Sequence, residues 1–283
     1  MIQKKMLPNG FTYLEVRNKK AEAKIALQGA HIFHFQARGR PSLLWLSTLS
    51  RFEKNVAIRG GIPICFPWFG KLKNASTRPQ HGFARTSMWE LVQEEEIDEN
   101  TTRIELALRS NDASKALWEY DFELRLTIII SEDLHLSMTV HNTDTQAFEI
   151  TTALHSYFNL YKIQESRVEG LENCSYYDDL TQKQSTQTTA LSIDQEVDRY
   201  YWDIPDKVSL INKNFTIELT QKGTRTMVVW NPWTDKSKHI MDMNNDAYRN
   251  MLCLETAQRG PDAQIVAPEE SSTISVTIRM NPH

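Results

Sequence analysis

Hydrophobic and polar residues alternate along most of the chain, as they do in β-strands that bury one face. In residues 122–128, for example, Phe, Leu, Leu and Ile alternate with Glu, Arg and Thr. The same alternation, or a short apolar run between turn residues, predicts further strands at 11–16, 24–27, 31–36, 102–109, 134–140, 215–219, 225–230, 251–255 and 274–278. These segments predict antiparallel sheets with one face in a core.

Helical periodicity is confined to two short segments, residues 113–118 and 46–52. Long helices between the strands would have indicated a parallel sheet, and the sequence lacks that pattern. The polar stretch 182–189 is interpreted as a solvated loop or hairpin tip. Because no internal repeat or long linker divides the chain, residues 1–283 are expected to form a single all-β domain of two large packed sheets.

The segment 58–91 differs from the rest of the chain in its concentration of glycine, proline, aromatic and basic residues. Glycine permits positive φ angles and proline fixes φ, so this segment is expected to be a shaped loop rather than a core strand. The residues that shape it are Gly60, Gly61, Gly70, Pro63, Pro67 and Pro79.

The stretch from residue 51 to residue 85, which overlaps this segment, carries an excess of positive charge. Against a single acid, Glu53, it holds Arg51, Lys54, Arg59, Lys71, Lys73, Arg78 and Arg85. Because the whole chain has a formal net charge of −4, a polyanion such as nucleic acid is disfavoured as a partner, and a small anionic ligand is indicated.

Three aromatic residues, Trp68, Phe69 and Trp89, stand among these cations. Aromatic rings suit the C–H faces of a sugar, and guanidinium groups suit phosphate. The alternative is that these rings only pack a long surface loop.

Whole-chain properties limit the class of protein. The 283 residues are 40% hydrophobic and 24% charged, which are ordinary values for a globular protein with a sizeable core. Residues 1–13 lack an apolar signal region, and no apolar run reaches the roughly 18 residues of a membrane span. A soluble cytoplasmic protein without a membrane partner is therefore expected.

Neither the cysteines nor the other histidines indicate a metal site. Cys65, Cys174 and Cys253 form no CxxC motif, which fits a reducing compartment and gives no zinc signature. His31 and His34 are three residues apart in a predicted strand, so they face opposite sides of it. The histidines at 135 and 141 fall on the polar faces of their strands and are expected to be solvated.

Two titratable residues occupy the less bulky face of a predicted strand. His155 projects opposite Leu154, beside small residues, and Glu255 projects opposite Leu254. Each alone has a structural explanation, as a hydrogen-bonded strand-end histidine or a solvated strand terminus. Together they indicate an acid/base pair.

Six motifs, in this order, carry a resemblance to a known family. The motifs are GGIPICFPWFG (60–70), QHGFAR (80–85), LHSYF (154–158), VDRYY (197–201), WNPW (230–233) and CLET (253–256). In them the chain resembles the glucose-6-phosphate 1-epimerase branch of the aldose 1-epimerase family, also called hexose-6-phosphate mutarotases. With the flanking strands they cover nearly the whole chain.

The resemblance implies a galactose-mutarotase-like β-supersandwich that interconverts the α and β anomers of a hexose 6-phosphate without a cofactor or metal ion. By motif, the catalytic histidine and glutamate of the family match His155 and Glu255. The substrate-binding residues of the family match Arg59, Gln80, Arg85 and Asp198. A monomer is expected. The continuation TAQ (256–258) departs from the Asn-containing sequence common among relatives.

The expected chemistry agrees with these residue types. Mutarotation removes the proton of the C1 hydroxyl and protonates the ring oxygen; the aldehyde then rotates and closes on its other face. Glu255 as carboxylate suits the base and His155 as imidazolium suits the acid, with exchanged roles on closure. Asp198 could hold a sugar hydroxyl or orient His155.

Two other functions stay open at this point. A mutarotase for neutral sugars would leave Arg59 and Arg85 without an anionic partner, which argues against it. A non-catalytic sugar-phosphate-binding protein on the same fold would not need both His155 and Glu255.

Overall fold

Antiparallel β-strands form nearly all the regular structure in the computed structural model, which describes residues 1–72 and 77–283. The N-terminal sheet has four strands: β1 (Ile2–Met6), β2 (Thr12–Arg17), β3 (Ala21–Ala26) and β4 (His31–Ala37). A two-stranded sheet pairs β10 (Phe148–Ile150) with β22 (Gln264–Val266). The strands predicted from alternation are confirmed, with boundaries that differ by a few residues.

The largest sheet has nine strands and forms one layer of the fold. Its order is β16 (Leu191–Ser192), β13 (Arg167–Glu169), β18 (Lys207–Ile211), β19 (Phe215–Lys222), β23 (Ser271–Pro282), β9 (Leu134–Asn142), β8 (Phe122–Ile130), β7 (Thr101–Arg109) and β6 (Glu90–Asp98). Strands β8 and β9 alternate strictly between buried and half-exposed residues, which is the pattern that the sequence predicted.

The second layer contains a sheet of eight strands. Its order is β15 (Lys183–Thr186), β14 (Ser175–Asp178), β17 (Val197–Trp202), β20 (Thr226–Asn231), β21 (Met251–Gln258), β11 (Thr152–Leu154) and β5 (Ile64–Cys65), with β12 (Tyr157–Asn159) also paired to β21. The isolated bridge between Ile32 and Ile62 connects the N-terminal sheet to the segment before β5.

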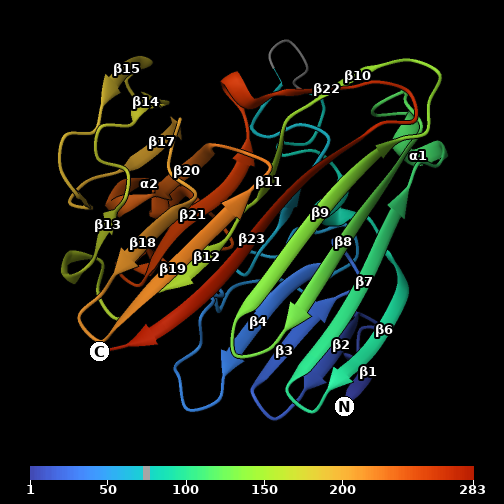
Figure 1. Cartoon of the computed structure of the whole chain (residues 1–283), viewed down its shortest axis with the longest axis horizontal. Coiled ribbons are helices and arrows are strands. Elements are labelled where there is room, and N and C mark those ends of the chain that lie inside the picture. Colours follow the sequence, from blue (N-terminus) through green and yellow to red (C-terminus); the bar gives the residue numbers. More distant parts are fainter. Residues whose placement is uncertain (73–76) are drawn as a thin grey trace.

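One hydrophobic cluster joins the three large sheets into a sandwich. It includes Leu126 of the nine-stranded sheet, Leu254 of the eight-stranded sheet and Ile25 of the N-terminal sheet, and each of these side chains is fully buried. In Figure 1 the blue N-terminal sheet lies behind β7 to β9, while β14, β17, β20 and β21 fill the left half. The expected all-β sandwich is confirmed.

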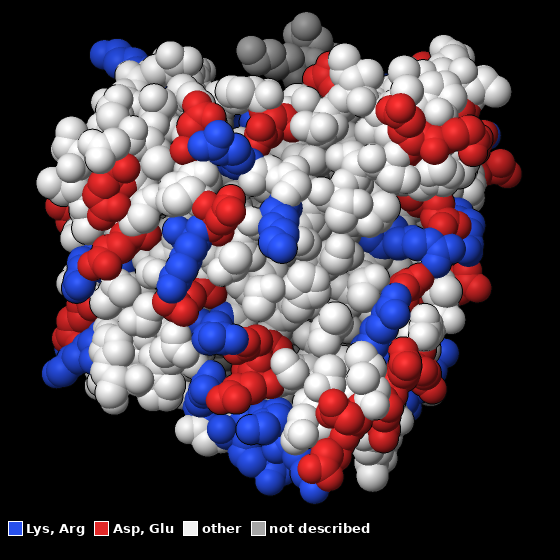
Figure 2. Space-filling view, in the orientation of Figure 1, with Lys and Arg blue, Asp and Glu red and all other residues white. Residues whose placement is uncertain are grey.

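Opposite charges are mixed over the outer face of the nine-stranded sheet. Figure 2 shows Lys and Arg side chains next to Asp and Glu across this view. Arg279 pairs with Asp133 at 2.6 Å, and Arg109 pairs with Glu123 at 2.7 Å. Interspersed charges of this kind give no single-sign surface for a polyanion.

The helices are short. They are α1 (Asp112–Lys115), α2 (Trp233–His239) and the 3₁₀ turns η1 (Ala84–Thr86), η2 (Ile163–Glu165), η3 (Ala247–Arg249) and η4 (Gly260–Asp262). The turn of helix predicted at 113–118 is confirmed as α1, which Asn111 caps by accepting from the amides of Ala113 and Ser114. No helix in the described residues is both long and apolar enough to cross a membrane.

The helices differ from the prediction in two places. Residues 46–52 form no helix, because the Leu46 backbone forms a bridge to Gly60 and a turn follows it. Helix α2 was not predicted. Only Ser237 of its seven residues is buried, so the segment lacks the apolar periodicity by which a helix is recognised.

The other local predictions have mixed outcomes. The polar stretch 182–189 is exposed as expected, but its residues 183–186 form strand β15, paired with β14, rather than a loop or hairpin tip. His31 is buried and His34 is half-buried. The prediction that they face opposite sides was wrong, because a bulge at Phe33 pairs them with Ala26 and Lys24 of β3, which share one face. The half-buried His135 and His141 lie on the polar face of β9.

Candidate functional site

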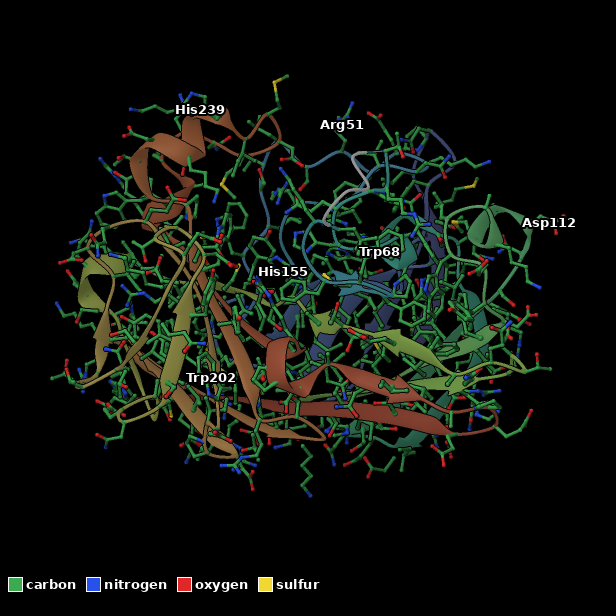
Figure 3. The ribbon with its side chains drawn as sticks, turned by 90° about the horizontal axis from the view of Figure 1, so that it is seen from above. Arg51, Trp68, Asp112, His155, Trp202 and His239 are labelled. Carbon is green, nitrogen blue, oxygen red and sulfur yellow. The ribbon has the colours of Figure 1, made fainter. Side chains whose placement is uncertain are left out.

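A cleft of about 320 Å³ opens on the face of the eight-stranded sheet that points away from the nine-stranded sheet. Alternation along β21 produces this arrangement, because Leu252 and Leu254 enter the main core while Glu255 lines the cleft. Figure 3 shows His155 near the middle of the molecule, on the side away from the red strand of the other layer. The cleft is lined by Arg59, Phe69, Gly70, Lys71, Gln80, His81, Arg85, His155, Tyr157, Asp179, Asp198, Val228, Trp230, Lys236, Ile240, Glu255 and Arg259.

His155 and Glu255 meet in this cleft although a hundred residues separate them. The Nδ1 atom of His155 lies 3.3 Å from Oε1 of Glu255, and both side chains are buried. His155 follows β11, where its amide donates to the carbonyl of Pro63 at 3.0 Å. Its ring is stacked on Tyr157, with centroids 4.9 Å apart and an interplanar angle of 8°. The predicted pair is thus brought together and its imidazole is held in a fixed plane.

Burial changes the proton affinity of both groups. It lowers the pKa of His155 well below its ordinary value, and the positive charges of Arg85 and Arg59 act in the same direction. Burial also raises the pKa of Glu255 well above its ordinary value, with a further contribution from Asp198. Because each shift favours the uncharged form, the pair holds one proton in total over a wide range of pH.

Asp198 reaches the cleft from β17, the strand next to β20. Its nearest cation is Lys236 of α2, 3.6 Å away, and Lys236 also pairs with Glu196 at 2.9 Å. Burial is the main reason that the pKa of Asp198 is raised to about 6. The carboxyl group lines the same cleft as the acid/base pair but forms no hydrogen bond or ion pair with His155.

Arg59 enters the cleft with its charge already balanced. Its Nε atom donates to Asp242 at 3.0 Å, and its Nη1 atom donates to the Tyr157 hydroxyl at 3.1 Å. The positive φ of Gly60 and Gly61, which the sequence predicted, shapes the backbone here. A Cβ atom on Gly61 would lie only 2.3 Å from the carbonyl oxygen of Ile32.

Arg85 differs from Arg59 because no carboxylate balances it among the described residues. Its Nη2 atom donates to the backbone carbonyl of Gln80 at 2.7 Å. Burial lowers the pKa of Arg85, so the guanidinium is a poorly compensated charge at the cleft wall. Gln80 itself is exposed and lines the cleft.

His81 also lines the cleft, and the sequence analysis did not select it. Its ring lies between Phe69 and His155, at centroid distances of 5.2 and 5.5 Å. The amide of Gly70 donates to its Nδ1 atom at 3.2 Å, and burial lowers its pKa well below the ordinary value. A neutral ring that accepts at Nδ1 carries its proton on Nε2, which makes His81 a hydrogen-bond donor.

The turn that carries His81 requires a glycine at position 82. Gly82 has φ +69°, and a Cβ atom there would lie 1.9 Å from the carbonyl oxygen of Phe66. The glycine at position 82 of the motif 80–85 was the one sequence signal that the backbone beside His81 packs closely against another segment.

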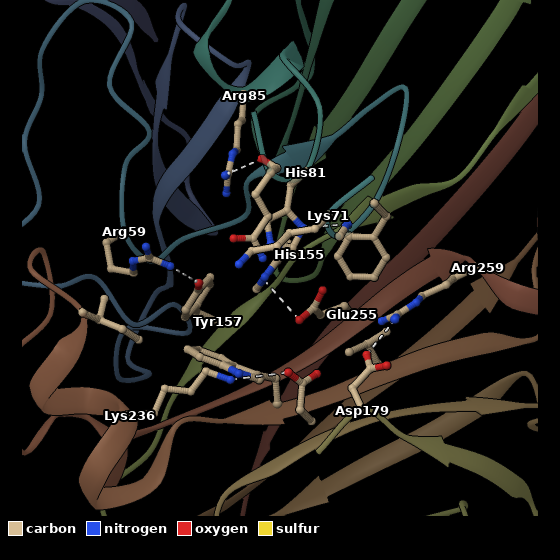
Figure 4. Close-up of a pocket in the computed structure, with 17 residues that line it drawn as sticks. Arg59, Lys71, His81, Arg85, His155, Tyr157, Asp179, Lys236, Glu255 and Arg259 are labelled. Carbon is tan, nitrogen blue, oxygen red and sulfur yellow. Dashed lines mark hydrogen bonds and ion pairs between the residues drawn. The ribbon is translucent and has the colours of Figure 1, made fainter. Parts of the chain in front are cut away.

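A second group of charges lies on the far side of the acid/base pair. Arg259 pairs with Asp179 at 2.6 Å, and its guanidinium lies over the rings of Tyr200 and Phe69, at 4.5 and 5.6 Å from their centroids. In the view of Figure 4, His155 and Glu255 lie between Arg85 on one side and Asp179 on the other. These residues were missed, although Gly260 and Pro261 directly follow Arg259 in the sequence. Gly260 has φ +62°, and a Cβ atom there would lie 2.9 Å from the ring of Tyr200.

The predicted loop residues have different outcomes. Phe69 and Lys71 line the cleft, whereas Trp68 and Trp89 belong to the main core. Trp68 donates from Nε1 to the carbonyl of Pro79 at 2.8 Å. The packing alternative is therefore correct for both tryptophans.

The remaining predicted cations do not reach the cleft. Arg51, Lys54 and Arg78 are exposed and do not line it, and Lys73 lies outside the described residues.

Folding also brings three metal-ligating side chains together, although the sequence shows no metal-binding motif. The donor atoms of His155, Cys253 and Glu255 all lie within 4.8 Å of one another, and all three residues are buried. The three cysteines of the chain are free and buried.

Comparison with known proteins identifies the family. Residues 13–279 match the aldose 1-epimerase family. The chain belongs to the aldose 1-epimerase family. A Cenchrus ciliaris protein named as a candidate glucose-6-phosphate 1-epimerase is 36% identical over 263 residues, covering 88% of this chain and 79% of that protein. An Escherichia coli protein with the same name is 32% identical over 270 residues, covering 94% and 89%.

Solved structures of aldose 1-epimerase relatives share the whole fold. A candidate mutarotase from Salmonella typhimurium has a TM-score of 0.93 at 30% identity, covering 100% of this chain and 94% of that chain. A galactose mutarotase related enzyme from Lactobacillus acidophilus has a TM-score of 0.75 at 16% identity, covering 96% and 97%. The family and the galactose-mutarotase-like fold are those that the motifs indicated, and the aldose 1-epimerase family places the chain among isomerases.

Proposed function

We propose that this aldose 1-epimerase family member is a glucose-6-phosphate 1-epimerase, in which His155 and Glu255 transfer the protons. The observation that carries the proposal is the acid/base pair, with 3.3 Å between Nδ1 and Oε1, in a cleft that also holds the uncompensated cation of Arg85. The names of the relatives from Cenchrus ciliaris and Escherichia coli agree with this substrate.

The single proton of the pair is sufficient for the reaction. In the charge-separated form, the Glu255 carboxylate accepts the proton of the C1 hydroxyl while the His155 imidazolium protonates the ring oxygen. The C1–O5 bond breaks and the open aldehyde forms. The pair then consists of a neutral imidazole and a carboxylic acid, which is the form that burial favours.

Ring closure reverses these transfers after rotation about the C1–C2 bond. The Glu255 acid now protonates the aldehyde oxygen, and His155 removes the proton of the attacking C5 hydroxyl. The summed charge of the pair stays at zero throughout. A buried site therefore never has to stabilise a change in net charge, which would be costly at low dielectric.

Arg85 is the principal phosphate ligand in this proposal. Arg59 already pairs with Asp242 at 3.0 Å, whereas Arg85 donates only to the Gln80 carbonyl among the described residues. An anion would balance the charge of Arg85 and add charge-assisted hydrogen bonds. Gln80 lies next to this position and is proposed to bind the same end of the sugar phosphate.

Arg59 and Asp198 are assigned to the sugar and to the geometry of the pair. Arg59 donates to the Tyr157 hydroxyl, and the Tyr157 ring is stacked on His155, so Arg59 also fixes the catalytic ring. Asp198 forms no hydrogen bond or ion pair with His155 and is proposed to bind a sugar hydroxyl rather than to orient the imidazole.

No cofactor is assigned, because two side-chain proton transfers account for the chemistry. The functional unit is proposed to be a monomer.

Polarimetry tests the proposal against its alternatives. Starting from the pure α anomers, the protein should accelerate mutarotation of glucose 6-phosphate far more than that of glucose. Equal acceleration of both sugars would indicate a neutral-sugar mutarotase. Binding of glucose 6-phosphate without acceleration above the spontaneous rate would indicate a non-catalytic binding protein. The variant His155→Asn provides the folded, inactive control.

A further inference from the structure

Three donor atoms at the cleft are not fully used by the sugar chemistry. His155 and Glu255 line the cleft, whereas Cys253 packs in a buried cluster with Tyr157 and Met251. Among the described residues, His155 Nδ1 and Glu255 Oε2 are buried without a hydrogen-bond partner. The thiol of Cys253 lies on the same face of β21 as Glu255, two residues before it, and is fully buried. All three donors lie within 4.8 Å of one another.

We propose that His155, Cys253 and Glu255 form a binding site for Zn²⁺ and similar thiophilic divalent ions, and that such an ion inhibits the enzyme. Nitrogen, sulfur and carboxylate oxygen are the donors that zinc takes in proteins. Three protein ligands leave the fourth position of a tetrahedral ion open toward the cleft. A hard ion such as Mg²⁺ requires oxygen ligands and does not fit this set.

The geometry is close to that of a formed site. With metal–ligand bonds of the usual length, neighbouring ligands of a tetrahedral zinc ion lie about 3.3–3.6 Å apart. The distance from His155 Nδ1 to Glu255 Oε1 is 3.3 Å. The longest separation in the trio is no more than 4.8 Å and has to shorten by about 1 Å.

The charges also balance. A Glu255 carboxylate and a Cys253 thiolate together carry two negative charges, which a divalent ion neutralises. Binding releases two protons to water, that of the thiol and the one held by the His155–Glu255 pair, because the ligands are the thiolate, the carboxylate and the neutral imidazole. An ion in this buried position is stabilised by its ligands rather than by solvent.

Inhibition follows from the identity of two of the ligands. While His155 and Glu255 coordinate the ion, neither can exchange a proton with the sugar, and the ion fills the position of the reacting C1 and ring oxygen atoms. Inhibition should therefore be competitive, with a raised KM and an unchanged kcat. This consequence rests on the proposed function, whereas metal binding itself does not.

Spectroscopy with Co²⁺ tests the site without any assay of activity. Cobalt bound to a thiolate shows a sulfur-to-metal charge-transfer absorption. Wild-type protein and Cys65→Ala should show this absorption, and Cys253→Ala should lack it. Cys65 is the matched control, because it is a buried cysteine on the cleft face of the same sheet, on β5, but outside the trio.

Kinetics provides the second test. Zn²⁺ should raise the apparent KM for glucose 6-phosphate, a chelator should restore it, and Mg²⁺ should have no effect. Cys253→Ala should keep the activity seen without metal but need at least about ten times more Zn²⁺ for the same inhibition, in the range known for weakened metal sites.

Three outcomes would overturn the inference. One is an unchanged Co²⁺ absorption in folded Cys253→Ala, and another is noncompetitive zinc inhibition that Cys253→Ala retains. If Cys253→Ala does not fold, Glu255→Gln replaces it in the Co²⁺ titration, and an unchanged affinity would equally refute the site. If the protein does not epimerise sugars but loses Co²⁺ binding in Cys253→Ala, the proposed function fails and the metal site stands.

Discussion

Replacing Arg85 with glutamine tests whether the cleft recognises phosphate. Among the described residues its guanidinium donates only to the carbonyl of Gln80, at 2.7 Å, and no carboxylate pairs with it. Burial lowers the pKa of Arg85, so its charge is less well stabilised in the free cleft than in water. A bound phosphate would stabilise this charge. Removal of the Arg85 guanidinium should therefore weaken the binding of phosphorylated sugars much more than that of neutral sugars.

The size of the effect follows from the energy of such a contact. A charge-assisted hydrogen bond contributes about 1.5–3 kcal/mol, so Arg85→Gln should weaken binding of glucose 6-phosphate by roughly 10–150-fold. The phosphate lies away from C1 and changes little as the ring opens. Its contacts are therefore similar in the ground and transition states, and KM should rise much more than kcat falls.

The assay is polarimetric mutarotation of glucose 6-phosphate and of glucose, with kcat and KM determined for each. Arg78→Gln is the matched control, because Arg78 belongs to the same loop and is exposed outside the cleft. Equal losses on both sugars, or a loss confined to kcat, would refute the assignment of Arg85 to phosphate.

Arg59→Gln should behave differently from Arg85→Gln. It removes the partner of Asp242 and the donor to Tyr157, whose ring is stacked on His155. A lower kcat on both sugars is expected, since the catalytic ring loses its support. If Arg59→Gln changed only KM for the phosphorylated sugar, the link through Tyr157 would be wrong.

Four further results are expected. His155→Asn and Glu255→Gln should each lower kcat by roughly 10²–10⁴, and the double variant should lose much less than the product, because both act in one proton cycle. In a plot of kcat against pH, the acid-side midpoint should lie below pH 6.5, because burial lowers the pKa of His155. Activity disappears only when the His155–Glu255 pair takes a second proton. A midpoint at or above pH 6.5 would contradict this. Exhaustive chelation should not lower activity, and restoration of lost activity by a divalent ion would disprove that. Gly82→Ala should lower the free energy of unfolding by roughly 2–4 kcal/mol in urea titrations, whereas Gly10→Ala, with nothing within 4 Å of its added Cβ, should lower it by about 1 kcal/mol.

The order of apolar and polar residues was enough to determine the strands and their faces. Leu254 enters the core and Glu255 enters the cleft because successive side chains of a strand point to opposite sides. The rule failed at β4, where a bulge puts His31 and His34 on the same face, paired with Ala26 and Lys24 of β3. Motifs that follow one another along the chain were likewise enough to indicate the family. The faces of a strand follow from local backbone geometry, so they can be inferred from the order of residues alone.

The composition of the cleft was only partly determined in this way. His155, Glu255, Arg59, Gln80, Arg85 and Asp198 all line it as the motifs indicated. His81 and Arg259 were missed, because nothing in the sequence shows that their side chains turn toward His155 or the neighbouring rings. Helix α2, which supplies Lys236, was missed because its residues are mostly polar.

Pairing between distant strands decided the rest. Sequence alone made Arg59 and Arg85 equivalent cations; the fold places Asp242 3.0 Å from Arg59 and leaves Arg85 without a carboxylate among the described residues. It also joins His155 and Cys253 to Glu255 within 4.8 Å. Charge compensation and ligand geometry depend on which side chains meet across sheets, and residue spacing along the chain does not contain that information.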